Sequence, residues 1–194
     1  MSVSAIILSG GRATRMGGVD KGLVLLRERP LIQHVIQRIQ PQVDELWINA
    51  NRELPAYRGL GIPVLRDEHQ DFIGPLAGFY VGLKQTKRAF LLTVPCDSPN
   101  LPQDLVARLL TALTTQNADI AVAASEGYAH PVVSLCKATL LPSLTDFIAA
   151  GERKVSRWQK QQAYIEVDFN DIPQAFINLN TRDDVQSLEK HLAA

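Results

Sequence analysis

The sequence predicts an α/β protein, a three-layer sandwich with a mostly parallel, Rossmann-like sheet covered by helices on both faces. Short apolar runs of strand type alternate with longer segments of helical periodicity, which is the pattern of such sheets. The chain has 194 residues, and 46% of them are hydrophobic, enough for one substantial core. We therefore expect residues 1–194 to form a single domain.

The apolar periodicity places the individual elements. Leu31, Val35 and Ile39 recur at helical spacing behind Pro30, which suits a first helical turn. Further helices are expected at 75–85, 102–113, 140–149 and 182–192. The expected strands are 5–9, 46–50, 63–66, 90–94, 120–124, 132–135, 164–169 and 175–179.

The charge and the cysteine content indicate what the protein binds and where in the cell it works. The formal net charge is zero, so no global basic field attracts nucleic acid or an anionic membrane. The two cysteines, Cys96 and Cys136, form no zinc or disulfide pattern, and no apolar run reaches membrane-spanning length. We expect a cytoplasmic protein that binds neither nucleic acid nor membrane.

A glycine-rich turn follows the first expected strand. Residues 6–21 contain four glycines and three cations, among them Gly10, Gly11, Arg15 and Lys21. Glycines let backbone N–H groups approach a phosphate closely, and Arg15 and Lys21 can neutralise a triphosphate. The P-loop pattern does not fit this turn. The dinucleotide fingerprint does not fit it either, which argues against a dehydrogenase. The alternative is a flexible surface turn with solvated charges.

A lone aspartate ends the expected strand 90–94. Asp97 lies between Pro95 and Pro99, which stiffen the exit from the strand. A rigid carboxylate at the sheet edge that carries a phosphate cradle suits Mg²⁺, a hard cation that prefers oxygen ligands. The alternative is that Asp97 caps a turn or the next helix. We expect Cys96 to be a small half-buried residue and not a nucleophile.

These motifs resemble the GT-A-like nucleotidyltransferases, also called nucleotide-diphospho-sugar transferases, whose first loop reads Leu-x-Gly-Gly, Arg-Met-Gly and Lys. More narrowly, the chain is similar to the molybdenum cofactor guanylyltransferases, bacterial enzymes that attach GMP to molybdopterin. The segments that carry this resemblance span nearly the whole chain: 8–11, 15–22, 49–52, 74–78, 95–97, 130–131, 151–153 and 178–181.

The resemblance implies a role for each matching residue. Arg15, Lys21 and Asp97 are then catalytic, with Mg²⁺ as cofactor on Asp97. The positions implied to hold GTP are Leu8, Ser9, Gly10, Gly11, Lys21, Asn49, Asp67 and Asp97. Those implied to hold the acceptor are Gly78, His130, Arg153, Asn178 and Asn180.

Independent physical support differs among these residues. Asn49 ends an expected strand and Asp67 follows another, so both should reach the ligand-binding edge of the sheet. Ordinary turn roles remain the alternative for both. His130 is equally open to being a surface residue. Ser9 and Lys154 stand where the family often has alanine and arginine.

The implied reaction is transfer of GMP from GTP to the terminal phosphate of molybdopterin, with release of pyrophosphate. The N-terminal half would bind the nucleotide and the C-terminal half the acceptor. The resemblance also implies transient contact with proteins that deliver molybdopterin and with apo-molybdoenzymes. Alternatives are a relative that uses CTP or a sugar-phosphate acceptor, and a catalytically silent nucleotide-binding regulator.

Overall fold

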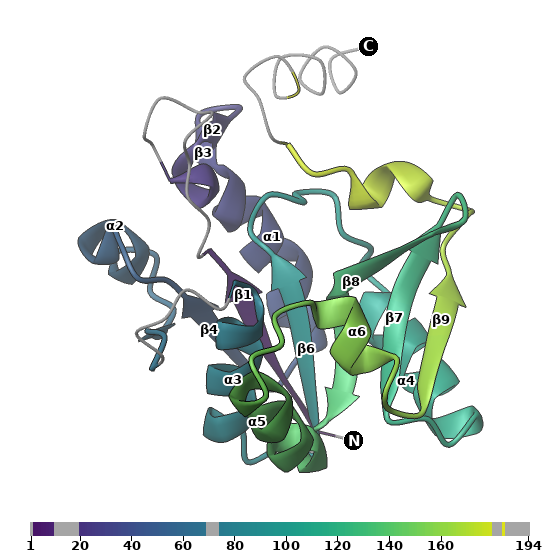
Figure 1. The fold of residues 1–194 in the computed structure, drawn as a ribbon. Helices are drawn as coiled ribbons and strands as arrows, with labels where there is room; N and C mark the ends of the chain where they lie inside the picture. The colour runs from purple at the N-terminus through teal and green to yellow at the C-terminus, as the bar shows by residue number, and fades with distance from the viewer. Residues whose placement is uncertain (1, 10–19, 69–73, 180–183, 185–194) are drawn as a thin grey trace.

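One twisted sheet runs through the protein (Figure 1). The computed structural model describes residues 2–9, 20–68, 74–179 and 184. The sheet has seven strands in the order β5-β4-β1-β6-β8-β7-β9, and β8 alone runs antiparallel to its neighbours. The strands are β1 (Val3–Leu8), β4 (Glu45–Asn49), β5 (Val64–Leu65), β6 (Phe90–Pro95), β7 (Ile120–Ser125), β8 (Tyr128–Lys137) and β9 (Tyr164–Asp168).

Helices cover both faces of the sheet and make three layers. One face carries α1 (Leu31–Ile39) and α4 (Leu105–Thr115), whose apolar side chains pack with those of β1, β4 and β6. The other face carries α3 (Leu76–Gln85), α5 (Leu141–Ala149) and α6 (Val155–Gln159), which pack in a second core cluster. The predicted fold class is confirmed.

Helix α1 shows how the sequence produces a layer. Ile32, Val35 and Ile39 are fully buried against the sheet, while Gln37 on the other side is exposed. Leu31 is fully buried in a separate small cluster with Leu26 and Leu179. Burying one aliphatic side chain of this size contributes about 1.5–3 kcal/mol. The apolar stripe therefore fixes which side of the helix faces the core.

One expected strand is wrong. Residues 175–179 do not join the sheet; the structure has a 3-10 helix there, η4 (Pro173–Phe176). Pro173 has no N–H to give to a strand, and the backbone N–H of Ile177 turns back to the carbonyl of Gln174. The expected helix 182–192 lies outside the described residues, apart from Asp184.

The sequence did not predict several short elements. The hairpin β2 (Leu25–Leu26) and β3 (Arg29–Pro30) turns at Arg27 and Glu28, both at positive φ, without the glycine or asparagine that marks such turns. The short helices α2 (Leu54–Arg58) and α6 were also missed. The remaining 3-10 turns are η1 (Lys21–Leu23), η2 (Gln40–Gln42) and η3 (Ala138–Leu140). Among the described residues, no helix combines the length and apolar character needed to cross a bilayer.

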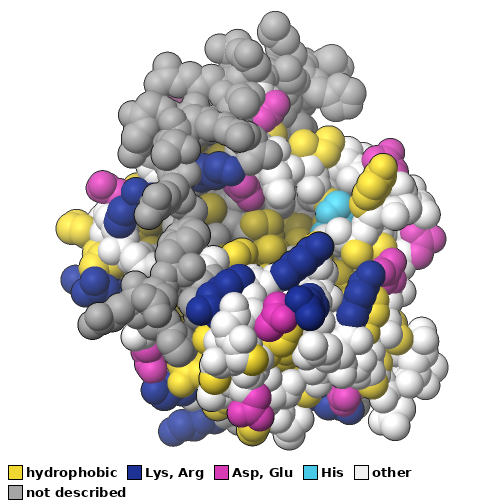
Figure 2. All heavy atoms as spheres, in the orientation of Figure 1, with side chains coloured by type: hydrophobic (Ala, Val, Ile, Leu, Met, Phe, Trp, Pro, Cys, Tyr) yellow, Lys and Arg dark blue, Asp and Glu magenta, His cyan; other side chains and the backbone are white. Residues whose placement is uncertain are grey.

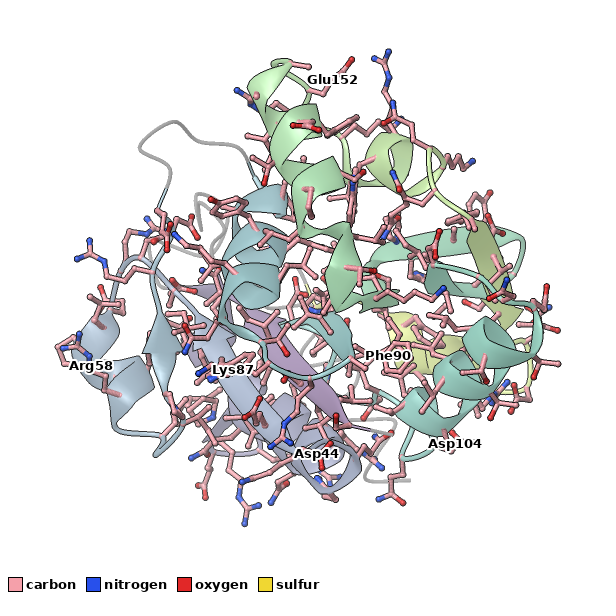
Figure 3. All side chains as sticks on the ribbon, turned by 90° about the horizontal axis from the view of Figure 1, so that it is seen from below. Asp44, Arg58, Lys87, Phe90, Asp104 and Glu152 are labelled. Atoms are coloured by element: carbon pink, nitrogen blue, oxygen red, sulfur yellow. The ribbon has the colours of Figure 1, made fainter. Side chains whose placement is uncertain are left out.

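The two edges of the sheet differ in what they expose. Figure 3 views the edge where the parallel strands begin, with Phe90 at the start of β6 and Asp44 just before β4. The strands β1, β4, β5 and β6 end at the opposite edge, which is the edge where open α/β sheets bind ligands.

Both cysteine thiols should be unreactive in the folded protein. Cys96 and Cys136 are buried, and burial raises the pKa of each thiol to about 12. At pH 8 only about one thiol in ten thousand would be ionised, so a thiol-disulfide reagent should find no target in the native protein. Titration with such a reagent should count both thiols only after denaturant is added; immediate reaction of either one in native protein would contradict the packing described here.

Candidate active site

Strand register brings the functional side chains to one edge. Leu8 at the end of β1 pairs with Asn49 at the end of β4 and with Pro95 at the end of β6. Asn49 in turn pairs with Leu65 at the end of β5. The residues that follow these strands therefore meet at the carboxyl edge of the sheet, as the sequence predicted.

Lys21 and Asp97 face each other at this edge. Lys21 opens η1, and its Nζ lies 3.4 Å from Oδ2 of Asp97, two residues beyond β6. The Asp97 side chain is only 10% exposed, and burial raises the pKa of its carboxyl, an effect that the Lys21 ammonium opposes. The separation exceeds an ordinary N–H···O hydrogen bond, so the contact is a loose ion pair. Gly10, Gly11 and Arg15 lie outside the described residues.

Asn49 and Asp67 also come together. The Asn49 side chain is 3% exposed, and its Nδ2 donates to Oδ1 of Asp67 over 2.8 Å. Asn51, which the sequence did not single out, donates to Oδ2 of Asp67 over 2.6 Å and accepts from the Asp67 backbone N–H. The two asparagines hold the carboxylate in one orientation.

Gly78 packs closely against Leu8 and Asn49. It lies in the first turn of α3, and a Cβ added there would come 2.4 Å from Cδ2 of Leu8 and 2.8 Å from Oδ1 of Asn49. Only glycine lets α3 approach the strand ends this closely. The structure thus places Gly78 against Leu8 and Asn49, although the resemblance assigned it to the acceptor.

The C-terminal segment meets the same edge through Asn178. The Ser98 hydroxyl donates to Oδ1 of Asn178 over 2.6 Å, and the Leu179 backbone N–H donates to the carbonyl of Asp97 over 3.0 Å. The segment that follows η4 is therefore hydrogen-bonded to the loop that carries Asp97. Asn180 lies outside the described residues.

His130 is half-buried on β8 and not an ordinary surface residue. Its Nε2 is 2.8 Å from the Ser125 hydroxyl, and its ring stacks on Phe176 with centroids 4.7 Å apart. Burial lowers the pKa of this imidazole, which favours the neutral form. His130 lies where three extra β8 residues, relative to β7, loop out of the ladder between Ala129 and Ser134.

Arg153 is exposed and engaged with its own helix end. Its Nη1 donates to the carbonyl of Ile148, in the last turn of α5, and to that of Glu152, three residues beyond the helix. Figure 2 shows a hollow with a hydrophobic floor on the face turned to the viewer, and Lys and Arg side chains gather along one side of it. The segment around α6 supplies four exposed cations: Arg153, Lys154, Arg157 and Lys160.

Sequence reasoning missed two buried polar groups behind Lys21. Asp20 is 4% exposed and accepts a 2.7 Å hydrogen bond from the hydroxyl of Tyr57, which is fully buried. Ser9 and Cys96 are buried beside Tyr57, and the Ser9 hydroxyl makes no hydrogen bond of ordinary geometry there. The one available signal was that Asp20 precedes Lys21, and nothing in the sequence paired it with Tyr57.

The oxygen donors at this edge fit a hard divalent cation. Within the described part of the chain, no cluster of three or more acidic, histidine or cysteine side chains could hold a metal unaided. Asp97 is instead a single buried carboxylate, which suits Mg²⁺ because this ion takes one or two carboxylates and completes its shell with water and substrate phosphates.

Solved structures show the same fold. Molybdopterin-guanine dinucleotide biosynthesis protein A from Archaeoglobus fulgidus superposes with a TM-score of 0.80, at 19% identity and 98% coverage of both chains. A 4-diphosphocytidyl-2C-methyl-D-erythritol synthase from Anaerococcus prevotii gives 0.77 at 12% identity, covering 100% of this chain and 99% of its own. At these identities the likeness shows the fold alone, which is that of nucleotidyltransferases.

Sequence comparison then gives the family. Residues 5–165 match the family described as the MobA-like NTP transferase domain. The molybdenum cofactor guanylyltransferase of Shewanella putrefaciens is 50% identical over 96% of this chain and 95% of its own length. That of Shewanella halifaxensis is 47% identical over 98% and 96%. The chain belongs to this family of nucleotidyltransferase enzymes, the molybdenum cofactor guanylyltransferases, which confirms the resemblance.

Substituting Gly78 should disturb the nucleotide site directly. In Gly78→Ala the new methyl group must displace Leu8 or Asn49, so we expect a loss of about 1–3 kcal/mol in stability and weaker GTP binding. Calorimetric titration and thermal unfolding measure the two effects.

Gly82→Ala is the matched control. Gly82 lies one helical turn beyond Gly78 on α3. A Cβ added there would meet Leu91 and Ile6 in the core. This variant should lose stability but keep its affinity for GTP. Equal losses of GTP affinity in both variants would count against a special role for Gly78.

Proposed function

We propose that the protein transfers GMP from GTP to the terminal phosphate of molybdopterin, which yields molybdopterin guanine dinucleotide and pyrophosphate. The observation that carries the proposal is the pairing of Lys21 with Asp97 at the carboxyl edge, where the glycine-rich turn ends. Lys21 would supply positive charge for the phosphates, and Asp97 a buried carboxylate for a metal. The names of the relatives from Shewanella support the choice of reaction.

The nucleotide is proposed to lie along the ends of β1, β4, β5 and β6. Lys21, with Arg15 and the backbone of Gly10 and Gly11, would hold the β- and γ-phosphates. Asn49 and Asp67 would hydrogen-bond the guanosine, since an aligned carboxylate and amide suit ribose hydroxyls and guanine N–H groups. Leu8 and Ser9 would line the floor of this site.

Mg²⁺ is the proposed cofactor, held by Asp97. When bound it neutralises negative charge on the α-phosphate and on the departing pyrophosphate. The protein's own contribution is to hold the donor in line with the attacking oxygen and to place Lys21 near the leaving group. A phosphate acceptor is already largely ionised near neutral pH, so no general base is required.

The acceptor is proposed to occupy the C-terminal side of the hollow. Asn178 is hydrogen-bonded to Ser98 in the loop that carries Asp97, His130 lies on β8 beside Ser125, and Asn180 comes two residues after Asn178. Arg153 and its neighbouring cations would attract the anionic pterin. Gly78 would let helix α3 approach both substrates closely. Transient binding of molybdopterin-delivering proteins and apo-molybdoenzymes, and a cytoplasmic location, belong to the same proposal.

Nucleotide selectivity tests the proposal. Pyrophosphate release is measured with GTP, CTP, ATP and UTP, each with Mg²⁺, with and without molybdopterin. Release that requires both GTP and molybdopterin is the expected result. Release with CTP but not with GTP would show that the enzyme transfers CMP and not GMP. Binding of GTP without any turnover would favour a catalytically silent nucleotide-binding regulator.

Removing the Asp97 charge should abolish turnover without unfolding the protein. Asp97→Asn keeps the side-chain volume but weakens metal binding, so we expect kcat to fall by about a hundredfold or more. Asp119→Asn is the control, because Asp119 pairs with Lys137 near the start of β7 and not at the site. Full Mg²⁺-dependent activity in Asp97→Asn would remove the metal assignment.

Removing the Lys21 cation should weaken triphosphate binding. Lys21→Met retains most of the apolar stem but leaves phosphate charge uncompensated, so kcat/KM for GTP should fall by about tenfold to a hundredfold. The matched control is Lys137→Met, which removes a lysine of similar exposure from an ion pair near the other sheet edge. Steady-state kinetics on both variants measures the effect. Equal kcat/KM values for Lys21→Met and wild type would show that Lys21 is an ordinary solvated surface residue.

A further inference from the structure

A buried hydrogen bond lies directly behind the candidate phosphate site. The hydroxyl of Tyr57 donates to Oδ1 of Asp20 over 2.7 Å, between residues 37 positions apart in the chain. Asp20 is 4% exposed and Tyr57 is 0% exposed. A buried carboxylate is costly unless it is well partnered, so its presence here calls for an explanation beyond core packing.

Tyr57 connects helix α2 to the base of the glycine-rich turn. It is the buried residue of α2, a five-residue helix on which Pro55, Ala56 and Arg58 are exposed. Its ring packs in the core cluster, and its hydroxyl reaches the residue just before Lys21. Tyr57 thus anchors the helix, together with the partly buried Leu54, and its hydroxyl points to the residue before Lys21.

The residue that follows Lys21 is fixed by the same hydroxyl. A Cβ built on Gly22 would lie 2.9 Å from the Tyr57 hydroxyl oxygen and 3.3 Å from both Cβ and Sγ of Cys96. Lys21 therefore sits between two residues that each contact Tyr57. Cys96 directly precedes Asp97, so the chain neighbours of both ion-pair partners pack on one another.

We infer that Tyr57 and Asp20 are positioning residues for Lys21: their hydrogen bond holds the start of η1 so that the ammonium faces Asp97 and the triphosphate. Neither side chain needs to touch the substrate. The inference rests on the proposed function, because Lys21 must bind a triphosphate for its orientation to matter. The hydrogen bond links α2 to Asp20, and none of the residues proposed to bind substrate makes this link.

Deleting the hydroxyl is the first test. We expect Tyr57→Phe to bind the non-hydrolysable analogue guanosine 5′-[α,β-methylene]triphosphate with Mg²⁺ about threefold to tenfold more weakly than wild type, because Lys21 gains freedom. Titration calorimetry gives the affinity without any acceptor. Most of the kinetic effect should appear in KM for GTP, with a smaller change in kcat.

Tyr164→Phe is the matched control. The Tyr164 hydroxyl also donates to a carboxylate, Glu166, but it lies at the start of β9, away from the site. Loss of this hydroxyl should leave the affinity for the analogue unchanged. An equal loss in both phenylalanine variants would show a general effect of hydroxyl removal and would overturn the inference.

A double-mutant cycle separates positioning from simple stability. If Tyr57 acts through Lys21, adding Tyr57→Phe to Lys21→Met should weaken binding no further, to within about twofold. A purely structural role would give the full Tyr57→Phe loss again in that background. Full additivity would therefore contradict the inference, as would wild-type affinity in the Tyr57→Phe single variant.

Asp20 provides a second variant with a conservative rescue. Asp20→Asn keeps an oxygen that can accept from Tyr57, whereas Asp20→Leu does not, so the first should retain most of the affinity and the second should match Tyr57→Phe. Loss of Mg²⁺-dependent binding in Asp20→Asn as large as in Asp97→Asn would instead make Asp20 a metal ligand. Wild-type protein that binds no analogue at all would overturn the proposed function, a result distinct from every failure of the positioning role.

Discussion

The register of the parallel strands is the constraint on which the site depends. Leu8 pairs on one side with Asn49 and on the other with Pro95, and Asn49 pairs with Leu65. Backbone hydrogen bonds across four strands therefore fix the position of Asn49, and closely constrain Asp67 and Asp97, which each follow a strand end by two residues. A slip of one residue in a strand such as β1 would exchange the side chains that it contributes to the two core clusters, and so disrupt the packing on both faces. The same interactions that build the core thus set the geometry of the site.

Side-chain contacts refine what the register brings together. Asn51 and Asn49 orient Asp67, while Tyr57 and Asp20 flank Lys21 from the core side. Opposite them, the Leu179 N–H and Asn178 join the C-terminal segment to the loop that carries Asp97. The loop that carries Asp97, the residue proposed to hold Mg²⁺, therefore contacts both the proposed donor side and the proposed acceptor side.

The sequence predicted the layers and the edge that carries the site, because periodicity and the ends of parallel strands determine both. It did not predict the contact between Tyr57 and Asp20, which depends on a helix of five residues and on packing across 37 positions. Residues 175–179 were wrongly expected as a strand because apolar content outweighed the effect of Pro173. The β2–β3 hairpin was missed because Arg27 and Glu28 adopt positive φ without glycine.

The position of an isotope in the product tests the central claim most directly. The enzyme is incubated with molybdopterin, Mg²⁺ and GTP labelled with ³²P at either the α- or the γ-phosphate. Attack at the α-phosphorus predicts that the α label appears in the dinucleotide and that the γ label leaves entirely in pyrophosphate. Transfer of the γ label to molybdopterin would show a kinase-type reaction and would contradict the account of this sheet edge as a nucleotidyl-transfer site.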